Sequence, residues 1–188
     1  MKFYLKWFYG YKNFWDEMLF FWLLNYLQTS YNPESFTVEV WDKQRMQSRT
    51  QQNKSYLDTG ILDKLDFIEN TENSVIVRRL RQVLAILWFD KYKKYFKIFW
   101  GWEVLDESRK FPHNGRNLPL LHHYSIRKWQ FILLWWIGTD DKNSTKKLYS
   151  YLLPKAQKIV CREVGSVKRA KKYSADNTLL FQDFSKEI

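Results

Sequence analysis

The 188-residue chain has one cysteine, Cys161, and no apolar run as long as a membrane-spanning helix. A single cysteine cannot form an internal disulfide, and no spacing of Cys and His suits a zinc site. The apolar runs Met18–Leu27 and Trp129–Gly138 are each about half of the roughly 20 residues that a spanning helix needs. We therefore expect two buried helices and no stable membrane insertion. The N-terminal segment also lacks the features of an organellar presequence and of a signal-peptide cleavage site.

Patterns typical of catalytic sites are also missing. No glycine-rich loop could cradle a phosphate, and no nucleophile stands at motif spacing from a base. His122 and His123 would point to opposite sides of an extended strand, and no acid cluster joins them or His113 in a metal site. The pair Asp140-Asp141 precedes a predicted helix, where capping and the helix dipole explain it. The sequence therefore predicts no enzyme, cofactor, metal or small-molecule substrate. For the histidines, the remaining interpretations are packing in the fold or stacking on RNA bases.

What the chain has in excess is positive charge and aromatic side chains. Lys and Arg number 31 against 20 Asp and Glu, which gives a net charge of +11. That balance indicates a polyanionic partner, either a nucleic acid or an anionic membrane surface. Aromatic residues make up 19% of the chain, a value that a coding bias can also produce. At helical spacing most of them are expected in the core, and Trp7 and Tyr9 are the better candidates for stacking on bases.

The pattern of apolar residues and turn signals predicts a mostly α fold, a single helical domain with one projecting basic β-hairpin. Residues 1–12 are predicted to be a basic aromatic arm, 13–184 the helical RNA-binding domain and 185–188 a tail. Residues 33–73 are interpreted as a partly flexible insertion, with a short strand at 36–41 and a short helix within 57–68. Further helices are predicted at 13–31, 74–87, 90–99, 125–137 and 144–162, with a short basic helix near Phe184.

The hairpin is predicted at about 101–124. Trp102 and Val104 alternate with polar residues, Asn114-Gly115 is a typical two-residue turn, and a second extended run closes at Pro119. Arg and Lys on its arms could hold RNA phosphates, although a solvated surface loop explains the same residues.

The C-terminal third is the second basic region. Between Lys142 and Lys172 stand ten basic residues and one acid, Glu163. Charge runs often mark solvated helix faces, but an excess across two predicted helices and a loop favours a surface for a polyanion. The predicted RNA-binding residues are Lys2, Lys6, Arg109, Lys110, Arg116, Arg127, Lys128, Lys142, Lys146, Lys147, Lys168, Arg169, Lys171 and Lys172.

The order of these features resembles the second half of the universal ribosomal protein seven of the small subunit. The matching residues are Ser108-Arg109-Lys110 with Pro119, Arg127-Lys128 before Trp135-Trp136, Gly165-Ser166-Val167-Lys168-Arg169 and Ala175-Asp176-Asn177. Where that family has Gly-Gly in the hairpin, this chain has His113-Asn114-Gly115. The likeness covers residues 100–184, and it covers 13–31 and 74–99 only in outline.

The resemblance implies a helical protein that binds the 3′ major (head) domain of small-subunit rRNA and nucleates head assembly. It would border the tRNA exit site near the mRNA path, beside neighbouring small-subunit ribosomal proteins. Divergence and aromatic bias favour an organelle-encoded member in the mitochondrial matrix. Two alternatives remain open: an accessory subunit of an organellar membrane complex, and a DNA-binding protein, for which no recognition-helix motif is visible.

Overall fold

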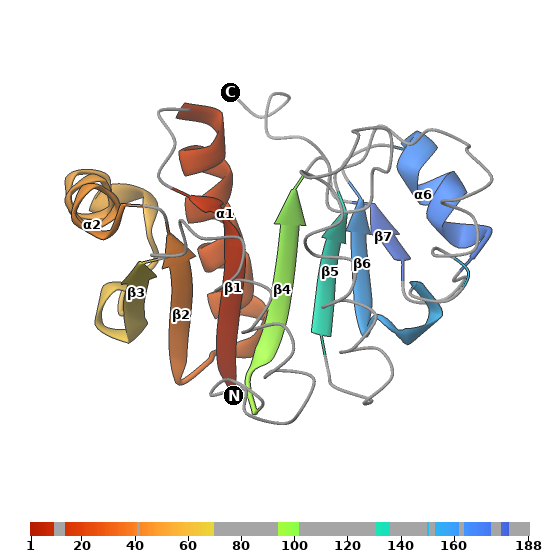
Figure 1. Cartoon of the computed structure of the whole chain (residues 1–188), viewed down its shortest axis with the longest axis horizontal. Coiled ribbons are helices and arrows are strands. Elements are labelled where there is room, and N and C mark those ends of the chain that lie inside the picture. The colour runs from red at the N-terminus through yellow and green to blue at the C-terminus, as the bar shows by residue number, and fades with distance from the viewer. Residues whose placement is uncertain are drawn as a thin grey trace, which may run out of the picture. The chain divides into compact units, whose positions relative to one another are not determined.

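A computed structural model describes residues 1–9, 14–40, 42–69, 94–101, 131–135, 150, 153–161, 164–173 and 178–180. The chain divides into two compact units. Figure 1 labels their helices and strands. Unit 1 comprises residues 1–81 with 90–97, and unit 2 comprises 82–89 with 98–188.

Unit 1 is built from alternating strands and helices. Its elements are β1 (Lys2–Tyr9), α1 (Phe14–Tyr31), β2 (Ser35–Val40), α2 (Lys43–Gln52), 3₁₀ turns at Lys54–Tyr56 and Leu62–Lys64, β3 (Leu65–Glu69) and the start of β4 (Phe96–Gly101). The strands β1, β2 and β3 are parallel neighbours, and β4 follows β1 in the order β3-β2-β1-β4. Parallel strands need a crossover connection, and α1 with the segment containing α2 supplies the two crossovers.

The sheet of unit 1 has one apolar face, which packs against α1. Successive residues of a strand point to opposite faces, so the register places alternate residues of β1, β2 and β3 together. The Phe3 ring lies 5.6 Å from Tyr31 of α1, and the Phe20 ring of α1 lies 6.3 Å from Phe67. The apolar side chains that share this face are Phe3, Leu5, Phe36, Val38, Phe67 and Phe96.

The predicted helix at 13–31 is confirmed as α1, and it is buried in the core of unit 1. The apolar run from residue 18 to 27 supplies the buried apolar side chains Leu19, Phe20, Phe21, Leu23, Leu24 and Leu27. Asn32 ends the helix with a positive φ of 40°, a conformation that asparagine tolerates, and its N–H donates to the carbonyl of Gln28 at 2.9 Å. In the part of the chain that the structure describes, no helix is long and apolar enough to cross a membrane.

Unit 2 contains a second set of parallel strands. Strand β6 (Lys158–Cys161) pairs with β5 (Phe131–Trp135) on one side and with β7 (Thr178–Leu180) on the other. A 3₁₀ turn at Leu153–Lys155 precedes β6, and α6 (Val164–Lys171) connects β6 to β7. The buried residues here are Ile159, Val160 and Cys161 of β6 and Ala170 of α6. The side of α6 that carries Ala170 therefore packs against this sheet.

The prediction of a mostly α fold is wrong, because the described residues form an α/β structure with parallel strands. Strands β4, β5 and β6 occupy stretches predicted to be helical at 96–99, 131–135 and 158–161. The physical reason is that a short apolar run fits a buried parallel strand as well as a buried helix turn. The predicted hairpin at 101–124 lies outside the described residues, apart from Gly101 in β4.

The N-terminal basic arm is also a wrong prediction. Residues 2–9 are β1, which lies between β2 and the start of β4, and Phe3, Tyr4 and Leu5 are buried. The alternation of Lys2-Phe3-Tyr4-Leu5 is that of a strand with one apolar and one polar face. The Met1 ammonium donates to Glu34 at 2.5 Å, and this hydrogen bond lowers the pKa of the Glu34 carboxyl.

The interpretation of residues 33–73 as a flexible insertion is wrong for the described part, 33–40 and 42–69. This stretch contains β2, where a short strand was predicted, together with α2 and β3. The loop after α2 is held to α1, because the Asn25 side chain donates to the Tyr56 carbonyl at 2.7 Å and accepts from the Asp58 N–H at 2.9 Å. The Lys64 ammonium donates to Gln28 and Asn32 at 3.1 Å each, near the C-terminus of α1, where the helix dipole favours a cation.

Candidate functional site

A basic surface on α6 is the candidate site that the structure and the sequence share. Lys168, Lys171 and Lys172 are exposed, Arg169 is half-buried, and Ala170 between them is completely buried. Residues three apart lie on one side of a helix, so Lys171 neighbours Lys168 on α6. Lys172 follows in the turn after the helix, where its N–H donates to the Arg169 carbonyl at 3.1 Å. Four of the predicted RNA-binding residues are therefore brought together here, and we call these four residues the α6 basic surface.

Two physical effects could place lysines at this point. Cations in the last turn of a helix are favoured by the dipole, which would explain Lys168, Arg169 and Lys171 without any ligand. The mutual repulsion of basic residues at four of five successive positions, 168, 169, 171 and 172, opposes this dipole effect. A polyanion that binds across α6 would relieve this repulsion.

Two of the other predicted RNA-binding residues belong to unit 1. Lys2 is exposed at the start of β1 in unit 1, and Lys6 also belongs to β1. The remaining eight lie outside the described residues. These are Arg109, Lys110, Arg116, Arg127, Lys128, Lys142, Lys146 and Lys147.

An ion-pair cluster around the buried Glu17 carboxylate joins α1 to α2, and sequence reasoning missed it. Glu17 is 4% exposed, and its Oε2 accepts a hydrogen bond from Arg49 Nε at 3.0 Å. Arg49 Nη2 lies 2.9 Å from the same oxygen. Arg45 Nη2 lies 3.6 Å from the other carboxylate oxygen. Arg45 and Arg49 are one helical turn apart on α2, so both reach the same carboxylate. The i, i+4 spacing of the arginines was visible in the sequence, but their partner stands 32 residues away from Arg49.

The second face of the unit 1 sheet is polar, which is unusual for parallel strands. Apart from Ile68, the residues that the register and the Lys97–Tyr4 contact place there are Lys2, Tyr4, Lys6, Ser35, Thr37, Glu39, Asp66 and Lys97. Lys97 is 2% exposed and its ammonium lies 5.7 Å from the centre of the Tyr4 ring. The Tyr4 hydroxyl donates to Glu39, so cation, ring and carboxylate form one partly buried network.

We expect Tyr4→Phe to destabilise unit 1 by about 1 to 3 kcal/mol, because the Glu39 carboxylate loses a charge-assisted hydrogen bond. Urea denaturation of the full chain measures this loss. Tyr56→Phe is the control, because Tyr56 is 53% exposed and should change stability by less than about 0.5 kcal/mol. Equal stabilities of the two variants would show that the network contributes nothing.

Fold topology alone does not define a small-molecule site. In doubly wound sheets ligands bind at the carboxyl ends of strands where the strand order reverses, and in unit 1 the order reverses at β1. The segment that follows β1 lies outside the described residues, and its sequence, Gly10-Tyr11-Lys12-Asn13, lacks a Gly-x-Gly phosphate loop. Within the described ranges, no group of three His, Cys, Asp or Glu side chains could hold a metal ion.

Comparisons of the chain with protein-family models, with curated proteins and with solved structures find no match.

Proposed function

We propose that the chain is a structural RNA-binding protein that holds RNA phosphates with the α6 basic surface. The carrying observation is that Lys168, Lys171 and Lys172 are exposed together above a buried Ala170. The net charge of +11 supports the same class of partner. Binding would be electrostatic, with lysines neutralising phosphates and releasing counterions.

In its more specific form, the proposal is that the chain is a constituent of the small ribosomal subunit in the mitochondrial matrix. There it would bind the 3′ major domain of the small-subunit rRNA. Support comes from motif spacing alone, because the helical fold that the resemblance implies is not the one the described residues adopt. The Gly165-Ser166-Val167-Lys168-Arg169 motif lies on α6, so the resembling residues coincide with the basic surface. Neighbouring ribosomal proteins, tRNA and mRNA near the exit site are the partners that this form of the proposal adds.

Neutralising the α6 basic surface should weaken RNA binding and its dependence on salt. For Lys168→Gln, Lys171→Gln and Lys172→Gln combined, we expect at least about a tenfold loss of affinity, and a log–log salt slope smaller by about 2 to 3. Fluorescence anisotropy at several salt concentrations measures both, with a 3′ major domain transcript and an unrelated structured RNA of equal length.

Two controls make the result specific. Replacing the same three lysines by arginine keeps the charge and should keep the slope. Lys94→Gln removes an exposed charge of unit 1. It should change the affinity less than twofold, which is the effect expected from the loss of a single exposed charge. An unchanged slope in the triple glutamine variant would contradict RNA binding by α6, and equal affinity for both RNAs would contradict only the ribosomal form.

A further inference from the structure

The outer surface of α2 in unit 1 combines glutamine and serine with flanking basic residues, and it lacks carboxylates. The apolar side of the helix is buried through Met46 and Thr50, one turn apart. The residues exposed on the outer side are Gln44, Gln47, Ser48, Gln51 and Gln52. From residue 43 to residue 57 the sequence contains no Asp or Glu, although the whole chain has 20.

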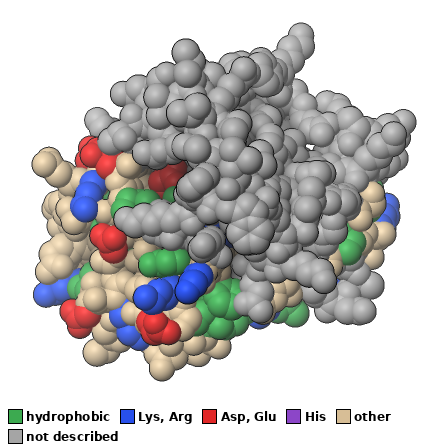
Figure 2. Space-filling view, turned by 60° about the horizontal axis from the view of Figure 1, so that its bottom comes forward, with side chains coloured by type: hydrophobic (Ala, Val, Ile, Leu, Met, Phe, Trp, Pro, Cys, Tyr) green, Lys and Arg blue, Asp and Glu red, His purple; other side chains and the backbone are tan. Residues whose placement is uncertain are grey.

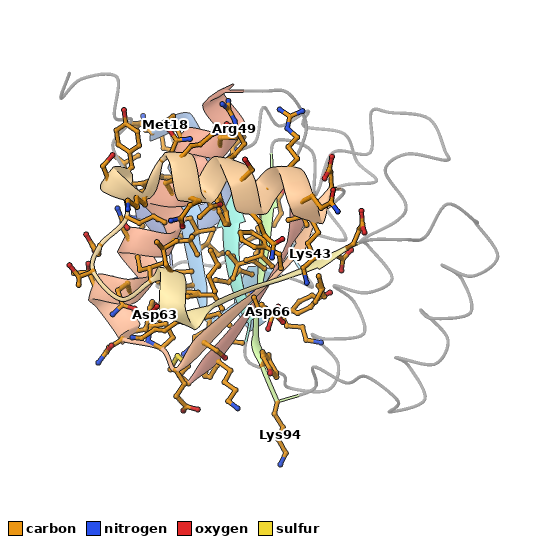
Figure 3. The ribbon with its side chains drawn as sticks, turned by 90° about the vertical axis from the view of Figure 1, so that its left-hand side faces the viewer. Met18, Lys43, Arg49, Asp63, Asp66 and Lys94 are labelled. Carbon is orange, nitrogen blue, oxygen red and sulfur yellow. The ribbon has the colours of Figure 1, made fainter. Side chains whose placement is uncertain are left out.

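The basic residues of α2 lie along the flanks of this outer side. In Figure 3, which looks at unit 1 from the left of Figure 1, Arg49 and Lys43 lie on opposite sides of α2. Asp63 and Asp66 lie on the same side as Lys43 in this view, so the side of Arg49 is the more positive one. On the face that Figure 2 shows, acidic and basic side chains of the described residues are interspersed.

The arginine flank is preorganised by Glu17. Arg49 uses Nε and Nη2 on the Glu17 carboxylate, and its side chain is still 41% exposed. The Arg45 side chain is 26% exposed, and its closest carboxylate oxygen is 3.6 Å away. Two guanidinium groups on one carboxylate leave a net positive charge, with N–H groups that the described hydrogen bonds do not use. A guanidinium already fixed in place loses less conformational entropy when it binds a phosphate.

We propose that this α2 surface, defined as Arg45, Arg49 and the outer glutamines and serine, is a second RNA-contact surface of the chain. Neutral amide side chains donate to phosphate oxygens and exchange hydrogen bonds with ribose hydroxyls, without the repulsion that glutamates would bring. The inference rests on the proposed function, because it takes RNA as the partner, but it uses residues of unit 1 alone. Sequence reasoning had assigned this stretch to a flexible insertion without RNA-binding residues.

The test adds acidic charge to the outer side of α2 while keeping the fold. Glutamate and glutamine have similar helix propensities, and Gln44 and Gln51 are exposed, so Gln44→Glu with Gln51→Glu should fold normally. The matched control places the same two charges at Ser30 and Thr59, exposed positions outside α2. For the α2 variant we expect roughly a fivefold to tenfold loss of affinity for the 3′ major domain transcript at 0.1 M salt, and less than twofold for the control.

The outcomes separate this inference from the proposed function. If the α2 variant weakens binding and the control does not, the second contact surface is supported. Equal affinities of the α2 variant and the control, with weak binding by the α6 triple variant, would overturn the inference and leave the α6 proposal intact. Full binding by both the α2 and the α6 variants would overturn both. If RNA affinity is unchanged but binding of a poly-glutamate probe is lost, the partner of α2 is an acidic protein and the inference is wrong.

Discussion

Phe3→Ala is expected to lower the free energy of unfolding by about 3 to 5 kcal/mol, among the largest effects of any single change in the chain. Phe3 is completely buried in β1, where its ring stacks near Phe36 at 6.1 Å and lies 5.8 Å from the Phe96 ring. It also contacts Tyr31 at the end of α1. Removing the ring would leave a cavity where three strands and a helix meet.

Urea denaturation of the full chain tests this prediction. Phe3→Leu keeps most of the volume and should lose about 1 to 1.5 kcal/mol. Lys2→Ala changes the exposed neighbour and should stay within about 0.5 kcal/mol of the parent. If Phe3→Ala left stability unchanged and reduced RNA binding instead, residues 1–9 would be a basic arm and the β1 assignment would be wrong.

Arg49→Met is expected to destabilise the chain by about 2 to 4 kcal/mol, because it leaves the buried Glu17 carboxylate without its hydrogen-bond donors. Arg45, at 3.6 Å from the other oxygen, compensates only in part. Methionine keeps the length and helix propensity of the side chain, so the change isolates the charge and its hydrogen bonds.

A double-mutant cycle with Glu17→Gln measures the coupling. Once Glu17 is uncharged, Arg49→Met should have a much smaller effect, with a coupling energy of at least about 1 kcal/mol. Arg45→Met in the parent should have a smaller effect than Arg49→Met, since Arg45 makes the longer contact. Additive effects of Glu17→Gln and Arg49→Met would show that the pair does not hold α2 against α1.

The elements that the sequence did predict have strong local signals. Helix α1 has 18 residues, a mostly apolar sequence and an Asn-Pro stop, all of which lie within one window. The α6 basic surface was found because its residues are neighbours in the sequence. Strand β2 was found from its alternation of apolar and polar residues.

The missed elements depend on contacts between distant residues. Nothing local distinguishes Phe131–Trp135 or Lys158–Cys161 from a turn of buried helix, and pairing with a neighbouring strand decides the outcome. In β1, Lys2, Tyr4 and Lys6 alternate with Phe3 and Leu5. The lysines led to the interpretation of this segment as a basic arm, because the polar face of the folded sheet was not predicted. The ion pair of Glu17 with Arg49 depends on how α1 and α2 pack, which no spacing rule gives.

The most direct test of RNA binding by α6 is crosslinking of the full chain in its source cells, followed by density-gradient sedimentation and identification of the crosslinked peptides. We predict that the chain sediments with RNA and that the crosslinked peptides include residues 164–173, with 3′ major domain sequences of small-subunit rRNA attached. A chain that sediments free of RNA, or that crosslinks to RNA without any peptide from residues 164–173, would contradict the account.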